Sequence, residues 1–178
     1  MRVFWERGYD SASTRDLLAA MDISRSSLYQ AFGNKEQLFL EALHRYRLTL
    51  LERLGHRLEA APSAMAFLEA LFYDTAAEAG SERAALGCLI FNSACELGQR
   101  RDLPSRQAQE CLTAITAVFH RAVRQAQAEG QIAADRDAEA LASYLTLGMA
   151  GLRTLLKSGM DIELAHQAVE TLLGALRR

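Results

Sequence analysis

Apolar residues recur at helical spacing along almost the whole chain, and few residues interrupt them. From Lys35 to about Arg57 they keep the spacing of one long helix for about six turns. Proline occurs only twice, at Pro62 and Pro104, whereas alanine and leucine abound. Because proline breaks helices and alanine and leucine favour them, this pattern predicts an all-α protein.

Glycine and proline mark the expected ends of the other helices. In front of the long helix we expect three short helices, one ending near Gly8, one over residues 14–20 and one from Ser24 to Gly33. Behind it, periodic segments predict helices over residues 63–79, 82–97, 105–129, 137–157 and 161–176. We therefore predict an N-terminal head, residues 1–47, joined by the long helix to a helical body, residues 48–178.

Composition and motifs argue against several classes of protein. Among the 178 residues no apolar run reaches the roughly 18 that a membrane span needs, and residues 1–10 lack the apolar stretch of a signal peptide. We therefore expect a cytoplasmic protein with no membrane partner. Catalytic signatures such as a nucleophile elbow, a phosphate-binding loop or HExxH are missing, so we expect no catalytic residue and no cofactor.

The cysteines Cys88, Cys95 and Cys111 are odd in number and match no paired zinc spacing. They predict neither a disulfide framework nor a metal site, and we interpret them as small buried hydrophobic residues. With a formal net charge of −2, the molecule as a whole is not basic. Any nucleic-acid surface must therefore be local.

The front of the chain carries the most informative pattern, two short helices joined by a tight turn. Ser13 and Asp16 form a capping-box-like start for the first, and Ser24 is a good N-cap for the second. Leu28 and Phe32, spaced i and i+4, give the second helix one inward stripe and leave its outward face polar. Such a pair is a helix-turn-helix, whose second helix can enter the major groove of DNA.

We expect that polar outward face to read DNA. Arg25 and Gln30 can hydrogen-bond to base edges, while Tyr29 and Lys35 suit phosphate oxygens. The predicted DNA-binding residues are Ser13, Arg15, Ser24, Arg25, Ser26, Ser27, Tyr29, Gln30 and Lys35. Taken alone, the same face also fits an ordinary solvated helix.

The wider stretch resembles the TetR/AcrR family of transcriptional regulators. The family pattern T-x-x-x-I-A-x-x-A-G-V-S-x-x-x-L-Y-x-H-F-x-x-K-x-x-L is matched in register by Ser13, Leu17, Ile23, Ser24, Leu28, Tyr29, Phe32, Lys35 and Leu38. The segment VFWERGYD also resembles the end of the family's first helix. The resemblance implies a ligand-responsive repressor, released from a palindromic double-stranded DNA operator by a small-molecule effector.

The sequence departs from the family pattern at several points. Asp22 stands where the turn usually has glycine, although aspartate tolerates left-handed conformations better than most residues. Ala31 replaces an aromatic residue or histidine that often touches the DNA backbone in the family. The family's first helix normally begins further upstream, so we expect the front of that helix to be missing here.

The predicted helix over residues 137–157 carries more apolar surface than one core-facing stripe requires, and the helix that follows it presents further apolar residues. The resemblance implies that they pair with their copies as a four-helix bundle, and a palindromic operator requires a two-fold homodimer. The predicted interface comprises Leu141, Leu145, Gly148, Leu152, Val169, Leu172 and Leu176. The alternative is that both helices only complete the core of one chain.

The segment GCLIFNSACELG, residues 87–98, resembles a motif of one subgroup of the family. Cys88, Asn92 and Cys95 are expected on roughly one helical face, and a buried Asn92 would need a polar partner, structural or ligand. With residues of neighbouring helices, this segment predicts an apolar effector cavity. The predicted lining is Phe67, Leu71, Phe72, Cys88, Phe91, Asn92, Cys95, Phe119, His120 and Tyr144. Plain core packing is the alternative for the aromatic residues, and thiol sensing would require an exposed cysteine with a lowered pKa.

The function that best fits these patterns is a ligand-responsive DNA-binding transcriptional regulator. A second hypothesis is a dimeric protein-interaction module that has kept the helix-turn-helix but lost DNA reading, given Asp22 and Ala31. A small helical enzyme is the third and least supported.

Overall fold

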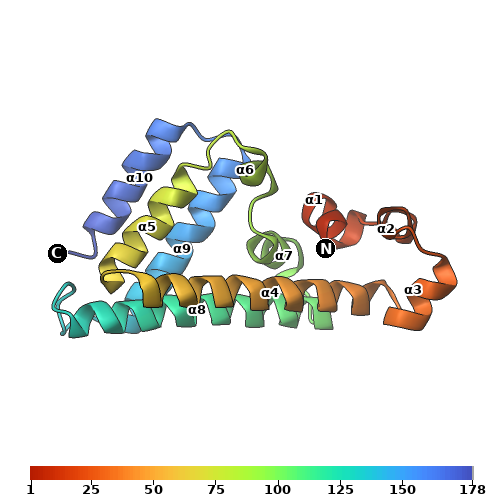
Figure 1. Ribbon diagram of the computed structural model, residues 1–178, viewed down its shortest axis with the longest axis horizontal. Coiled ribbons are helices and arrows are strands. Elements are labelled where there is room, and N and C mark those ends of the chain that lie inside the picture. The colour runs from red at the N-terminus through yellow and green to blue at the C-terminus, as the bar shows by residue number, and fades with distance from the viewer. Residues whose placement is uncertain (178) are drawn as a thin grey trace. The chain divides into compact units, whose positions relative to one another are not determined.

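The computed structural model describes residues 1–177 and is built of helices joined by short turns (Figure 1). In chain order the helices are α1 (Arg2–Ser11), α2 (Thr14–Met21), α3 (Arg25–Phe32), α4 (Lys35–Ala60), α5 (Ala64–Ala76), α6 (Glu82–Leu86), α7 (Leu89–Leu97), α8 (Leu103–Ala128), α9 (Ala138–Lys157) and α10 (Ile162–Gly174). The all-α prediction is confirmed. Over residues 1–177, none of the helices combines the length and the apolar character needed to cross a membrane.

The helix starts predicted at the front of the chain are confirmed by their caps. The Ser13 hydroxyl accepts a hydrogen bond from the Asp16 N–H, and the Asp16 carboxylate accepts one from the Ser13 N–H, which completes the capping box. The Ser24 hydroxyl accepts from the Ser27 N–H at 3.1 Å. Asn34 caps α4 in the same way, its Oδ1 lying 2.8 Å from the Gln37 nitrogen. Each cap satisfies an N–H that the helix itself leaves unpaired.

The prediction of one helix over residues 82–97 is wrong. The chain breaks at Gly87, where φ is 67° and ψ is −148°, and α6 and α7 lie on either side. This φ belongs to the left-handed side of the map, which glycine adopts at little cost. Cys88 is therefore the residue before α7. It is buried, Asn92 is half-buried and Cys95 is exposed, so the three do not share one buried face.

The described chain divides into two compact units. The first comprises residues 1–50 and 88–112, and the second comprises residues 51–87 and those from 113 onward. Both α4 and α8 therefore contribute residues to each unit.

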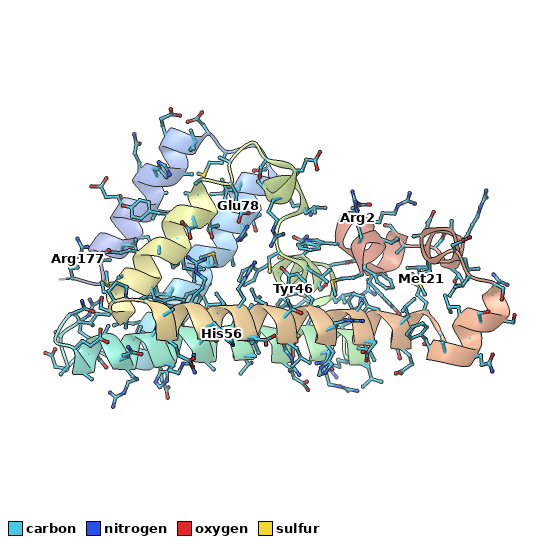
Figure 2. The ribbon with its side chains drawn as sticks, in the orientation of Figure 1. Arg2, Met21, Tyr46, His56, Glu78 and Arg177 are labelled. Carbon is cyan, nitrogen blue, oxygen red and sulfur yellow. The ribbon has the colours of Figure 1, made fainter. Side chains whose placement is uncertain are left out.

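In the first unit, α1, α2 and α3 lie beside the beginning of α4 (Figure 1). Aromatic rings form much of its core: Phe4 meets Phe39 edge-on with centroids 5.2 Å apart, and Trp5 meets Tyr46 at 5.0 Å. Tyr46, labelled in Figure 2, also donates its hydroxyl hydrogen to the Cys88 sulfur at 3.6 Å. These contacts fix α1 and the start of α7 against α4.

In the second unit, α5, α9 and α10 lie side by side (Figure 1). Phe67, Phe72 and Leu145 are fully or almost fully buried in its core. Glu78, labelled in Figure 2, pairs with Arg153 of α9, whose guanidinium also donates to the Thr75 hydroxyl. Burial of each large apolar side chain stabilises the fold by about 1.5–3 kcal/mol.

The close approach of α9 and α10 depends on Gly148. A Cβ at this position would lie 2.0 Å from the Leu172 Cδ1, so the leucine would have to move. We expect Gly148→Ala to lower the free energy of unfolding by up to about 2 kcal/mol, because overpacking costs about 1–3 kcal/mol and alanine inside a helix restores roughly 0.5–1 kcal/mol relative to glycine. Adding Leu172→Ala should make the penalty of Gly148→Ala much smaller, because the clashing atom is gone. Chemical denaturation of the two single variants and the double variant measures this coupling, and additive effects would contradict it.

Candidate nucleic-acid interface

The turn between α2 and α3 keeps its geometry without glycine. Asp22 adopts φ 52° and ψ 46°, and its N–H donates to the carbonyl of Leu18. The N–H of Ile23 donates to the same carbonyl at 3.3 Å. The expectation that aspartate can occupy this left-handed position is confirmed, and the two helices form a helix-turn-helix.

The two faces of α3 differ sharply. Leu28 is completely buried, and Leu17 of α2 is 2% exposed, so these leucines fix the motif from inside. On the other face Arg25, Tyr29 and Gln30 are exposed, and in the described part of the chain none of their side chains has a hydrogen-bond or ion-pair partner. This face therefore offers a guanidinium, a phenol and an amide to an external partner.

Serine hydroxyls gather at the N-terminus of α3. Besides capping Ser27, the Ser24 hydroxyl lies 2.8 Å from that of Ser26 and 2.9 Å from that of Ser27. No acidic residue lies in the first turn of α3. The positive end of the helix dipole is thus left without a local counter-charge, which favours an approaching phosphate.

The other predicted DNA contacts have different surroundings. Ser13 is engaged in its capping box, and the Ser13 hydrogen bonds lower the pKa of the Asp16 carboxyl. Arg15 is exposed on α2 and has no partner among the described residues. Lys35 is half-buried: its ammonium donates to the Asp10 carbonyl at 3.2 Å and lies 4.7 Å from the centroid of the Tyr9 ring.

The predicted effector residues are divided between the two units. In the first, Cys88 and Phe91 are buried, Asn92 is half-buried and Cys95 is exposed. In the second, the buried members are Phe67, Leu71, Phe72 and Phe119, while His120 and Tyr144 are half-buried. The rings of Phe72 and Phe119 lie 6.0 Å apart, and the Tyr144 hydroxyl donates to the Leu172 carbonyl at 3.0 Å. Tyr144 therefore already has a backbone partner.

The interpretation of all three cysteines as buried residues is wrong for one of them. Cys88 and Cys111 are buried, whereas Cys95 is exposed. Burial raises the pKa of the Cys111 thiol to about 11, which keeps it protonated and unreactive at neutral pH. Within residues 1–177, no group of three or more histidine, cysteine or acidic side chains is placed to hold a metal ion.

We expect a thiol reagent at pH 7 to label Cys95 in the folded protein and to reach the buried cysteines only in denaturant. Mass spectrometry of labelled peptides measures this selectivity. The variant Cys95→Ser should leave the folded protein almost unlabelled. Labelling of Cys111 as fast as Cys95 in the folded protein would contradict its burial and raised pKa.

The predicted dimer residues lie mostly inside a single chain. Leu141, Leu145, Leu152, Val169 and Leu176 are buried in the core of the second unit. The exposed apolar residues of α9 and α10 are different ones: Leu147 is 72% exposed, Leu164 53% and Leu155 47%.

An apolar groove of about 190 Å³ lies between α9 and α10. Its lining comprises Phe72, Gly148, Gly151, Leu152, Leu155, Met160, Ala168, Val169 and Leu172. Gly148 and Leu172 are the predicted interface residues that are only half-buried. Four of the predicted interface residues, Gly148, Leu152, Val169 and Leu172, therefore line this apolar groove.

Two family models together match most of the chain. Residues 1–42 match the model described as "Bacterial regulatory proteins, tetR family". Residues 64–172 match that of the "Tetracyclin repressor-like, C-terminal domain". The first match contains the helix-turn-helix, and the second contains the groove between α9 and α10.

Individual proteins show the same relationship. The chain is 34% identical to a cysteine mutant of the TetR-family regulator CifR, solved with a 26-bp double-stranded operator DNA, with a TM-score of 0.80 over 97% of this chain and 91% of that one. It is 29% identical to the uncharacterized HTH-type transcriptional regulator YezE of Bacillus subtilis, over 99% of this chain and 91% of YezE. The HTH-type transcriptional repressor ComR of Escherichia coli is 28% identical, over 97% of this chain and 83% of ComR. The chain therefore belongs to the TetR family of bacterial regulatory proteins.

Proposed function

We propose that this regulator is a homodimeric repressor that binds a palindromic operator through α3 and is released by a small-molecule effector. The observation that carries the proposal is the two-faced α3, with Leu28 buried and Arg25, Tyr29 and Gln30 exposed without partners in the described chain. A helix held only from its inner side can enter the major groove and place such side chains on base edges. The operator-bound CifR structure and the repressor ComR support the same function.

The proposed functions are assigned to different parts of the chain. We assign DNA reading to residues 1–47, and effector binding and dimerisation to residues within 48–178. The candidate contacts to DNA are the residues predicted from the sequence, among which Arg25 and Gln30 read bases and Arg15 and Tyr29 face phosphates. The Lys35 ammonium already donates to the Asp10 carbonyl. Ser24 acts mainly as the cap that shapes the start of α3.

Dimerisation is proposed to occur through the exposed apolar side of α9 and α10. Leu147, Leu155 and Leu164 would otherwise remain in water, and the groove beside them can receive apolar side chains of a second copy. A two-fold dimer presents two α3 helices to half-sites spaced by one helical turn of DNA, about 34–36 Å, or a multiple of it.

The effector is proposed to be a largely apolar small molecule held by the helices of the body. The buried aromatic residues Phe67, Phe72 and Phe119 supply apolar surface there. Release from DNA requires the effector to bind more tightly to a conformation of the dimer that does not fit the operator. Cys95 is not included among the proposed effector-binding residues because it is exposed.

Selection of DNA fragments from a random library by the purified protein tests the proposal. The expected product is one palindromic sequence, protected from cleavage over both half-sites. Selection of no sequence would contradict DNA reading and favour the protein-interaction module that kept only the fold of the motif.

A further inference from the structure

The end of α1 is held by a carboxylate from α7. The Glu96 Oε2 accepts the Tyr9 N–H at 2.9 Å, and its Oε1 accepts the Asp10 N–H at 2.8 Å. Gly8 makes this approach possible, because its φ is 80° and a Cβ there would lie 2.7 Å from the Glu96 Oε2. Two charge-assisted hydrogen bonds to adjacent N–H groups form a strong and directional contact.

Asp10 is held from two further sides. Arg100 pairs with both oxygens of the Asp10 carboxylate, its Nη1 lying 3.0 Å from Oδ1. The hydrogen bond from Arg100 holds the pKa of the Asp10 carboxyl below its usual value, so the pair stays charged at neutral pH. The Lys35 ammonium donates to the Asp10 carbonyl and lies over the Tyr9 ring. We call these contacts of Glu96, Arg100 and Lys35 the Tyr9–Asp10 clamp.

The clamp acts on the segment that sets the direction of α2. The Tyr9 ring packs on Phe39 of α4 with centroids 4.7 Å apart. Arg7 of α1 forms an ion pair with Asp16 of α2 at 2.9 Å. The turn at Asp22 joins α2 to α3, so the chain direction at Tyr9–Asp10 bears on where α3 is placed.

We propose that Glu96 and Arg100 are positioning residues for DNA reading, which hold Tyr9 and Asp10 so that α2 and α3 keep the orientation that fits the operator. Neither residue belongs to the helix-turn-helix. Without the clamp, α2 and α3 adopt several orientations, and only one of them fits the operator. The apparent affinity for the operator then falls in proportion to the fraction of protein in that orientation. This inference rests on the proposed function, because it requires an operator.

The variant Glu96→Gln distinguishes a positioning role from a purely electrostatic one, because the two predict opposite changes in affinity for the operator. It removes a negative charge, which by itself strengthens binding to all DNA. Lost positioning instead weakens binding to the selected operator, by about tenfold if the fitting orientation falls to about one tenth of the population. Affinity for random DNA should change little, because such binding depends mainly on charge.

Arg100→Ala has a matched control in the neighbouring residue. Arg101 is also exposed, and within residues 1–177 its guanidinium forms no ion pair. Arg100→Ala and Arg101→Ala each remove one positive charge from adjacent positions, so their electrostatic effects on DNA should be similar. We expect Arg100→Ala to weaken operator binding several-fold more than Arg101→Ala does.

Amide hydrogen exchange measures the clamp in the protein alone. The Tyr9 and Asp10 amides should exchange at least about tenfold faster in Glu96→Gln, in a protein that remains folded and dimeric. Unchanged exchange, or operator binding by Glu96→Gln as tight as that of the wild type, would overturn the positioning proposal alone. If the wild-type protein selects no DNA sequence, the proposed function is wrong, and so is this inference, which depends on it.

Discussion

Replacing Leu147 with glutamate should turn the dimer into a monomer and weaken operator binding by more than about 100-fold. Leu147 is the most exposed large apolar side chain of α9 and lies next to Gly148 of the groove. In the proposed dimer it is buried against the second copy, where an unpaired carboxylate costs several kcal/mol. A monomer also loses the cooperative contact with the second half-site.

Sedimentation velocity and operator titration measure the two effects. Leu48→Glu is the matched control, since Leu48 is 51% exposed on α4 and lies outside the proposed seam. The Leu48→Glu variant should remain a dimer. A dimer that survives Leu147→Glu would place the contact between copies on another surface of the protein.

Replacing Arg25 or Gln30 with alanine should weaken binding to the operator by about 1–3 kcal/mol, a factor of roughly 5 to 150. Both side chains are exposed on α3 and have no partner within residues 1–177, so their loss leaves the folded protein intact. Binding to random DNA should change much less after Gln30→Ala. Each variant should also relax the preference at one base pair of each half-site.

Arg15→Ala is the control for the loss of a positive charge. Arg15 lies on α2, the helix that crosses the DNA backbone in this motif. Its loss should weaken binding to operator and random DNA alike and reduce the salt slope by about one. If Gln30→Ala lowers both affinities in the same proportion, the assignment of α3 as the base-reading face is wrong.

Local features of the fold can be predicted from the sequence because their causes are local. Ser13 with Asp16, and Ser24 with Ser27, satisfy N–H groups within three residues of each cap. The left-handed turn at Asp22 follows from the tolerance of aspartate for that conformation. The helix-turn-helix is therefore recognisable from the order of its residues alone.

Other features depend on contacts between distant residues, and the sequence does not predict them. A glycine inside an apolar periodic segment is compatible with an unbroken helix, so the break at Gly87 has no clear signal. Periodicity shows that α9 has two apolar sides but not which side meets its own core, and Leu145, which is predicted for the dimer, is completely buried within one chain. The hydrogen bonds of Glu96 join residues 86 and 87 positions apart, and no spacing rule predicts them.

Sequence reading by α3 is measured by comparing the affinities of the wild-type protein for its selected operator and for a scrambled sequence of equal length, at several salt concentrations. A sequence-reading dimer should bind the operator at least about 1,000-fold more tightly at physiological salt. It should bind with two chains per palindrome, and raising the salt should weaken both affinities. Equal affinities for the two DNAs at every salt concentration would show that α3 does not read sequence and would contradict the proposed function.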